Sequence, residues 1–502
     1  MTVQAEAVTH PVLQARATDG TRPLLGWLVL APLFAAAILL RHVLAANTDV
    51  SWLLTAGERV LSGERLYVDV IETNPPMAVL VYLPGLLLAR ALGLPAEIVT
   101  DALVFAAILA SLAMVTRILK GAAALDGING WPLAWLGFAV LAILPMQSFG
   151  QREHIALIAL LPMLAVMVVR AKAESPMRWA IVVAGLGAGV ALAFKPHFAI
   201  GLLFGIFALA LVARAWRRLF VPEYFIAAAV AAFYLAFVIA LFPEFFTVIG
   251  PLVRDVYLPV GLSFGALLDK DAVSLWAIAL LAAYLLKRRG GIDATMVLLL
   301  ASSIGFAAVF FIQRKGWPYH AFPMLALALL GLGYAIASPA PVSSNSRAFR
   351  LGAMVLWLAV FSRALMWFDT AFDARPLQEA VARLGPHPVL LAISGEPGIG
   401  HPLVRAVGGT WVSRQQGLWV AAYLAHMRKS GPIDPALDAY AERERIMLIA
   451  DILKRPPTVV LVDDLTGDGT KWLAAHPDVA DLLKDFREVE TINRVKIMKR
   501  GG

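Results

Sequence analysis

Long apolar stretches recur through most of the chain and constrain its fold more than any other feature. From Pro23 onward, apolar runs, most of them about 17 to 20 residues long, alternate with short polar connections. Runs of this length can cross a hydrocarbon layer of about 30 Å as a helix. With 60% hydrophobic residues and a mean hydropathy of +0.75, the chain carries more apolar surface than a soluble core can bury. The sequence therefore predicts an α-helical polytopic membrane protein.

Eleven of these stretches are predicted to cross the membrane as helices. They cover residues 23–42, 97–116, 131–148, 155–169, 179–194, 198–212, 223–242, 272–286, 294–312, 321–337 and 351–368. A further stretch, residues 76–92, is at the short limit for a span and is interrupted by Pro84-Gly85. Such a break suits a helix on the membrane surface better than one that crosses. We therefore expect residues 76–92 not to cross, with a crossing as the alternative.

The distribution of basic residues predicts the orientation in the membrane. After residue 97, alternate loops hold thirteen Lys and Arg residues, whereas the intervening loops hold six. Clusters of this kind are typical of cytoplasmic loops, so they explain the net charge of +8 without nucleic acid binding. We expect a cytoplasmic tail at residues 1–22, a long first outer loop at residues 43–96 and an outer C-terminus. If residues 76–92 crossed instead, the first loop would be cytoplasmic.

After residue 368 the composition becomes that of a soluble domain. Strand-like runs at residues 388–393 and 458–462 alternate with helical patterns at residues 376–384, 440–453 and 471–484. This alternation predicts a small extracytoplasmic α/β domain over residues 369–502, following a transmembrane domain over residues 23–368. The chain has no cysteine, which excludes disulfides, thiol catalysis and cysteine-ligated metal.

Two acidic residues at the outer ends of predicted spans are candidate catalytic groups. Asp49 lies just beyond the first span, where a carboxylate could accept a proton from a substrate hydroxyl at the membrane surface. Glu153 lies in the tight connection between the third and fourth spans, where it could orient an acceptor. The alternatives are a solvated interfacial acid and an ordinary polar turn. Trp52 and Tyr67 would anchor the first loop at the headgroup region, and Asn74 begins its Asn-Pro-Pro element.

Basic and aromatic residues gather in the other outer connections. Arg152 directly precedes Glu153, and Lys195 and His197 join the fifth and sixth spans at lipid depth. A lysine there can either extend to water or hold a lipid phosphate. The densest cluster contains Arg314, Lys315, Trp317, Tyr319 and His320. Its basic residues oppose the charge bias of an outer loop, so phosphate binding with aromatic stacking on a sugar explains them better than anchoring.

Three other patterns carry little weight. The segment 395–400 reads Gly-Glu-Pro-Gly-Ile-Gly after a predicted strand, but Pro397 and the expected outer location argue against a nucleotide loop. Asp463, Asp464 and Asp468 lack the spacing of an EF-hand loop. The histidines are scattered and include no HExxH zinc pattern.

The layout of these residues resembles the C-type membrane glycosyltransferases, in the branch that contains protein O-mannosyltransferases and lipid A aminoarabinose transferases. Members have an acid early in the first outer loop, a Pro-Pro element ahead of an interfacial helix, and a second acid in the next outer loop. Asp49, Pro75-Pro76 and Glu153 occupy these positions here, and Lys195 matches a basic residue that follows the fifth span in some members. Members often have Lys or His before the Pro pair, whereas this chain has Asn74. The resemblance covers residues 20–370 and not the C-terminal domain.

The resemblance implies a GT-C-like bundle of about eleven transmembrane helices in a bacterial inner membrane. It implies inverting transfer of a monosaccharide from a polyprenyl-phosphate donor to an envelope glycan, lipid or protein acceptor. Asp49 would be the general base, and Glu153 would position the acceptor. Donor phosphate would contact Lys195, His197, Arg314, Lys315 and His320. Sugar or lipid would contact Trp52, Tyr67, Asn74, Arg152, Trp317 and Tyr319.

No cofactor is expected, no metal ligands are assigned, and a requirement for a divalent metal ion stays open. The expected partners are the lipid-linked donor, the acceptor and membrane lipids. Three other functions remain as alternatives. A polysaccharide polymerase or ligase would use a lipid-diphosphate oligosaccharide, and a transporter would leave the glycosidic bond intact. A noncatalytic scaffold would bind envelope glycans through the C-terminal domain.

Overall fold

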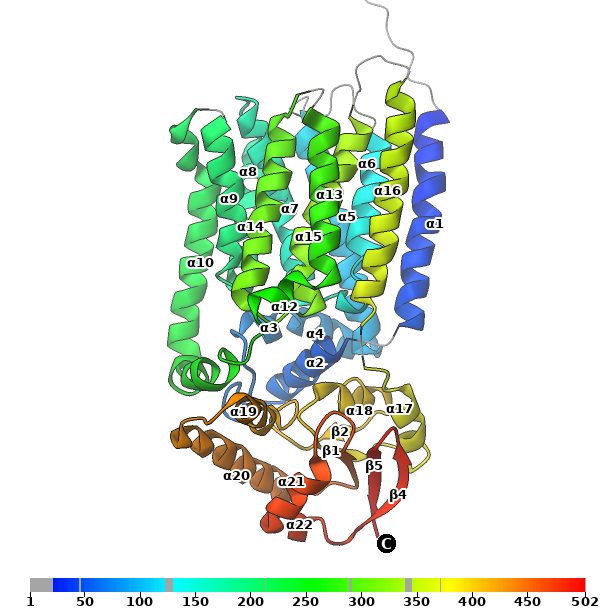
Figure 1. Ribbon diagram of the computed structural model, residues 1–502, viewed down its shortest axis with the longest axis vertical. Helices are drawn as coiled ribbons and strands as arrows, with labels where there is room; N and C mark the ends of the chain where they lie inside the picture. The colour runs from blue at the N-terminus through cyan, green and yellow to red at the C-terminus, as the bar shows by residue number, and fades with distance from the viewer. Residues whose placement is uncertain are drawn as a thin grey trace, which may run out of the picture.

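The computed structural model describes residues 21–44, 47–121, 130–212, 214–288, 291–338, 345–370 and 372–501. Its described residues form a bundle of long helices and a C-terminal domain built on a five-stranded sheet (Figure 1). A layer of short helices lies between the two. The predicted fold class, a helical membrane bundle followed by a small α/β domain, is confirmed.

Each of the eleven predicted spans coincides with an apolar helix of the bundle. These helices are α1 (Thr21–Val43), α5 (Ala96–Gly121), α6 (Gly130–Phe138, continued by a π-helix at Ala139–Ile143), α7 (Arg152–Ala171), α8 (Arg178–Phe194), α9 (Phe198–Val212), α10 (Pro222–Leu241), α13 (Asp271–Arg288), α14 (Ala294–Gln313), α15 (Pro318–Ala337) and α16 (Asn345–Phe368). By length and composition, six helices among the described residues can cross a membrane, or seven if α1 and α2 are one bent span. Some of the others, such as α8 and α9, are shorter.

The bundle is apolar outside as well as inside, which is the pattern that lipid solvation requires. Along α15, 89% of the apolar window is buried, whereas in the segment containing α10 only 11% is buried. Large apolar side chains of α10, such as Phe225 and Phe233, are therefore exposed on the outer surface of the bundle. Water would not solvate such a surface, so these faces contact the lipid.

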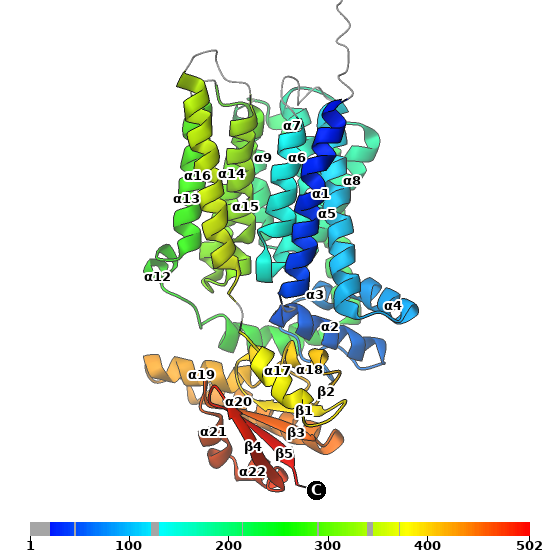
Figure 2. The ribbon, with the colours of Figure 1, turned by 90° about the vertical axis from the view of Figure 1, so that its right-hand side faces the viewer.

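The long first loop between α1 and α5 folds into three helices that lie across one end of the bundle (Figure 2). They are α2 (Thr48–Leu61), α3 (Met77–Leu80) and α4 (Leu83–Leu92), and α2 turns away from α1 by 74°. The hydroxyl of Tyr82 donates to the Gly150 carbonyl at 2.7 Å, which ties the α3–α4 turn to the bundle. Residues 76–92 thus form a broken surface helix in this structure, and they do not cross the bundle.

The C-terminal domain has strand order β2-β1-β3-β5-β4. The strands are β1 (Val389–Ile393), β2 (Thr410–Trp411), β3 (Val459–Asp463), β4 (Phe486–Ile492) and β5 (Val495–Arg500). The first three are parallel, and β5 pairs antiparallel with both β3 and β4. The main helices are α17 (Arg375–Ala382), α18 (Leu403–Ala406), α19 (Trp419–Ser430), α20 (Asp438–Lys454), α21 (Gly469–Ala475) and α22 (Pro477–Leu482). The residues of β1 and the first four residues of β3 are continuous apolar runs, as is typical of strands covered on both faces.

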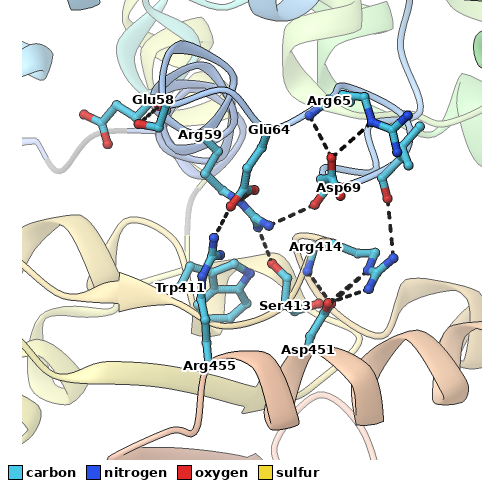
Figure 3. Close-up of polar contacts among 12 residues, drawn as sticks. Glu58, Arg59, Glu64, Arg65, Asp69, Trp411, Ser413, Arg414, Asp451 and Arg455 are labelled. Atoms are coloured by element: carbon cyan, nitrogen blue, oxygen red, sulfur yellow. Dashed lines mark hydrogen bonds and ion pairs between the residues drawn. The ribbon is translucent and has the colours of Figure 1, made fainter.

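The domain and the first loop share one hydrophobic core. A network of ion pairs also joins them (Figure 3). Arg414 forms a bidentate pair with Asp451, and its backbone carbonyl accepts from the Ile71 N–H of the loop at 2.7 Å. Arg59 of α2 donates to the Ser413 carbonyl at 2.7 Å and to Glu64, which also pairs with Arg455. These contacts fix the domain against the end of the bundle.

Replacing Arg414 with Ala should destabilise the C-terminal domain beside this junction by about 3 to 5 kcal/mol, because it leaves the Asp451 carboxylate of the same domain buried without its partner. The Asp451 side chain is only 7% exposed. Thermal unfolding of the purified protein in detergent measures the effect. Arg65→Ala is the matched control, because Arg65 is 71% exposed in its pair with Asp69 and should change stability by less than about 0.5 kcal/mol. Equal stability of the two variants would show that the buried pair of Arg414 and Asp451 does not stabilise the domain.

Candidate active site

A cavity of about 450 Å³ lies between the end of the bundle and the C-terminal domain. Four parts of the chain line it: the first loop, the ends of bundle helices next to the C-terminal domain, the segment after α10, and the loops and α19 of the C-terminal domain. Of the predicted site residues, eight line the cavity: Asp49, Trp52, Asn74, Arg152, Lys195, Trp317, Tyr319 and His320. Segments separated by up to about 370 residues in the sequence therefore meet in one place.

Asp49 is held in the first turn of α2 by the residue that begins the helix. Asn47 caps α2, and its side-chain oxygen accepts from the backbone N–H of Asp49 at 2.8 Å. The same oxygen accepts from the Gln151 side-chain amide at 2.6 Å. The Asp49 carboxylate receives a hydrogen bond from Arg152 at 3.2 Å and is 25% exposed, so one charged partner holds it while it faces the cavity.

Burial raises the pKa of Asp49 above its ordinary value, and Arg152 opposes this shift. The negative charges of Glu72 and Glu153 raise the pKa further. A carboxylate with a raised pKa takes up a proton more readily than an exposed aspartate. This electrostatic setting suits a general base that receives a proton during a reaction.

A buried polar cluster lies beside Asp49, at the outer ends of α7, α8 and α15. Lys195 follows the last residue of α8, where Pro196 favours an extended backbone for the residue before it. Its ammonium group pairs with the fully buried Glu153, contacts His320 Nε2 at 3.2 Å and donates to Gln313 at 3.3 Å. The second oxygen of Glu153 and the Nδ1 atom of His320 are buried without a partner among the described residues. The cluster therefore presents a cationic group at the cavity, backed by an acid.

Glu72 holds the first loop together by accepting hydrogen bonds from Trp52 and Asn74. Its carboxylate accepts from the Trp52 indole at 2.6 Å and from the Asn74 backbone N–H at 2.9 Å. The Asn74 side-chain amide also donates to Glu72, at 2.5 Å. Asn74 thus lines the cavity with its side chain engaged in holding the loop.

The structure places the other predicted site residues outside the cavity lining. Glu153 lies behind Lys195, and Tyr67 donates to the Asn74 carbonyl at 2.7 Å while its ring packs on Phe245. The remaining three are His197, Arg314 and Lys315. His197 packs on Phe198, Arg314 is exposed and donates to the Leu262 carbonyl at 3.0 Å, and Lys315 donates to the carbonyls of Tyr257 and Val260. Arg314 and Lys315 therefore hold the segment after α10 against the bundle.

Several cavity residues were not singled out as site residues from the sequence. They are Glu72, Gln147, Gln151, Tyr257, Glu396, Gln416, Trp419 and Tyr423. Glu72 lies two residues before Asn74 and could have been found by its place in the loop. Glu396 lies in the glycine-rich segment 395–400, for which the sequence argued against a nucleotide loop and suggested no other role. Nothing in the local sequence marks Trp419 or Tyr423, because only the docking of the domain brings them to the cavity. Tyr257, in the segment after α10, is also unmarked by its local sequence.

No group of three or more His, Asp or Glu residues is arranged to hold a metal ion in the part of the chain that the structure describes.

Comparison with solved structures shows the fold of the chain. A crystal structure of ArnT from Cupriavidus metallidurans in the apo state matches with a TM-score of 0.56 and 15% sequence identity, over 95% of this chain and 98% of that chain. A cryo-EM structure of the arabinofuranosyltransferase AftD from mycobacteria matches with a TM-score of 0.46 and 16% identity, over 95% of this chain and 40% of that chain. No family model and no curated protein sequence matches. The chain has the GT-C fold of ArnT, as the predicted resemblance implies.

Proposed function

We propose that the protein is a membrane glycosyltransferase that moves a monosaccharide from a polyprenyl-phosphate donor to an envelope acceptor. The observation that carries this proposal is the pairing of a candidate base, Asp49, with the cationic Lys195 cluster in one cavity at the bundle end. The GT-C fold shared with ArnT supports a glycosyltransferase over a transporter. The position of the cavity suits a donor whose lipid stays in the membrane.

The proposed reaction is an inverting displacement. The acceptor hydroxyl oxygen attacks the anomeric carbon, the bond from that carbon to the phosphate oxygen breaks, and the hydroxyl proton passes to Asp49. The polyprenyl phosphate leaves with the electron pair of the broken bond. Arg152 orients the Asp49 carboxylate through their hydrogen bond at 3.2 Å. Transfer then yields the glycosylated acceptor and free polyprenyl phosphate.

Lys195 and His320 are proposed to bind the phosphate of the donor. Both line the cavity, and the ammonium group can stabilise the charge that develops on the leaving oxygen. Glu153 is proposed to hold Lys195 in place, which replaces its expected direct role toward the acceptor. Arg314, Lys315 and His197 are not assigned to the phosphate, because their side chains lie outside the cavity lining.

The cavity is proposed to face the outside of a bacterial inner membrane. The Lys and Arg residues of the predicted cytoplasmic loops lie at the ends of bundle helices such as α7, α8 and α13, opposite the C-terminal domain. Nucleotide sugars are cytoplasmic, so an outward-facing transferase requires a sugar carried on a lipid. The acceptor is then an envelope glycan, lipid or protein.

A labelling experiment tests this outward orientation. The chain has no cysteine, so Ser62→Cys at the exposed end of α2 introduces a single thiol. We expect a membrane-impermeant maleimide to label this variant in intact spheroplasts. Ser175→Cys, in the exposed connection between α7 and α8, should be labelled only after lysis. Labelling of position 175 but not of position 62 in intact cells would contradict the proposed function.

A further inference from the structure

The C-terminal domain turns one edge of its parallel strands toward the cavity. Strand β1 ends at Ile393, and the loop that follows it contributes Gly395, Glu396 and Pro397 to the lining. The segment after β2 contributes Gln416 and then Trp419 at the start of α19. In open α/β sheets, ligands bind outside the carboxyl ends of the parallel strands. The domain thus meets the cavity with the edge at which such sheets bind ligands.

Four aromatic residues join the domain to the bundle along one wall of the cavity. Tyr423 stacks on Tyr257 with ring centroids 5.9 Å apart and an interplanar angle of 18°. Trp419 meets Tyr423 edge-on at 5.6 Å, and Tyr257 contacts Trp317 at 6.2 Å. All four rings line the cavity. A wall of this kind offers a broad apolar surface with polar tips, which suits the mixed surface of a sugar ring.

Glu396 adds a carboxylate to the same side of the cavity. Its Oε1 atom accepts from the Gly398 N–H at 3.0 Å, which fixes the side chain in the turn after β1. Its Oε2 atom makes no hydrogen bond within the described residues, so this oxygen is free to bind a ligand. Burial raises the pKa of Glu396, and the negative charge of Asp49, which lines the same cavity, raises it further.

We propose that Glu396 and the aromatic wall of Trp419 and Tyr423 form a sugar-binding subsite that the C-terminal domain contributes to the active site. This inference rests on the proposed function and deepens it. A carboxylate repels phosphate but accepts hydrogen bonds from sugar hydroxyls, so phosphate is bound at Lys195 and the sugar toward the domain. Glu396 and Tyr423 are specificity-determining residues in this account, and Asp49 remains the base.

The subsite is tested by comparing lipids that differ only in whether they carry a sugar and which sugar it is. Binding of undecaprenyl phosphate and of undecaprenyl-phosphate monosaccharides (mannose, glucose and arabinose) is measured on the full-length protein in nanodiscs. The variants are Glu396→Gln and Tyr423→Leu, with Glu379→Gln as the control because Glu379 is an exposed acid on α17 outside the cavity. Thermal unfolding checks that each variant is folded.

If the subsite holds the sugar of the donor, Glu396→Gln should weaken binding of the best sugar-bearing lipid about tenfold and change undecaprenyl phosphate binding less than twofold. If it holds a sugar of the acceptor, donor binding stays unchanged. In that case the KM of Glu396→Gln for solubilised envelope glycolipids from a deletion strain rises about tenfold, while its kcat with saturating acceptor stays close to the wild-type value. Either result supports the subsite and shows whether the sugar that it binds belongs to the donor or to the acceptor.

Two results would overturn the inference. If the wild type binds and transfers while Glu396→Gln and Tyr423→Leu match Glu379→Gln in every measurement, the subsite is wrong and the proposed function stands. If the wild type binds neither undecaprenyl phosphate nor any sugar-bearing lipid, the proposed function fails and the subsite fails with it.

Discussion

Replacing Asp49 with Asn is expected to slow sugar transfer on the order of a hundredfold or more, which is the usual contribution of a general base. The amide keeps the size of the side chain but cannot take the proton of the acceptor hydroxyl. Asn at position 49 can still contact Arg152, so binding of the donor should change little. Initial rates with labelled polyprenyl-phosphate sugar, together with donor affinity, measure the two effects separately.

Asp69→Asn is the matched control for this variant. Asp69 lies in the same outer loop, but its carboxylate is bound by the Arg65 backbone N–H at 3.0 Å and does not line the cavity. Burial raises the pKa of Asp49. As the pH is lowered, the wild-type rate should therefore begin to fall at a pH above the ordinary aspartate pKa of about 3.9. Transfer by Asp49→Asn at a rate close to that of Asp69→Asn would remove Asp49 from the role of base.

Replacing Lys195 with Met is expected to have two separate effects. Loss of the ammonium group at the leaving phosphate should lower kcat by about 100-fold to 1,000-fold, as the loss of one charge-stabilising donor does in other enzymes. The same change leaves Glu153, whose side chain is 0% exposed, without its cation, and should destabilise the fold by about 3 to 5 kcal/mol. Turnover and thermal unfolding in detergent measure the two effects.

The double variant Lys195→Met with Glu153→Gln separates catalysis from stability. It removes both charges, so the protein should regain most of the lost stability, because a neutral pair of similar size carries no buried unpaired charge. Activity should stay low, because the phosphate still lacks its cation. If the double variant regained both stability and turnover, the pair of Lys195 and Glu153 would be structural only.

The sequence predicted the bundle well because membrane spans follow from local hydropathy. Every predicted span coincides with a helix. Residues 76–92 form a broken helix, although the break lies at Val81 and Tyr82, and Pro84 and Gly85 belong to the first turn of α4. The predicted helical patterns of the C-terminal domain match α17, α20 and the pair of α21 and α22, which Pro477 divides, whereas α19 was not predicted. The β4–β5 hairpin was missed because β4 is mostly exposed and carries many charged residues. Such a strand lacks the apolar alternation on which strand prediction depends.

The candidate site was only half predictable, for a physical reason. Residues near the ends of spans, such as Asp49 and Lys195, are brought to one surface by the membrane itself, so hydropathy and loop order place them. Glu396, Trp419 and Tyr423 reach the cavity only because the domain docks through long-range contacts such as Arg59 with Ser413. Arg314 and Lys315 show the opposite case, since an outer-loop cation can be bound by backbone carbonyls instead of a ligand. Sequence position alone does not distinguish these outcomes.

The central claim is tested most directly by following a labelled sugar from donor to acceptor. Purified protein is mixed with a polyprenyl-phosphate monosaccharide, labelled in the sugar, and with envelope membranes from a strain that lacks the gene. Thin-layer chromatography then separates the lipids. The proposed function predicts that the label moves to a new glycolipid, glycan or protein while an equal amount of polyprenyl phosphate is released, and that Asp49→Asn abolishes most of this transfer. Label that stays on its original lipid with the glycosidic bond intact, whatever residue stands at position 49, would contradict the account.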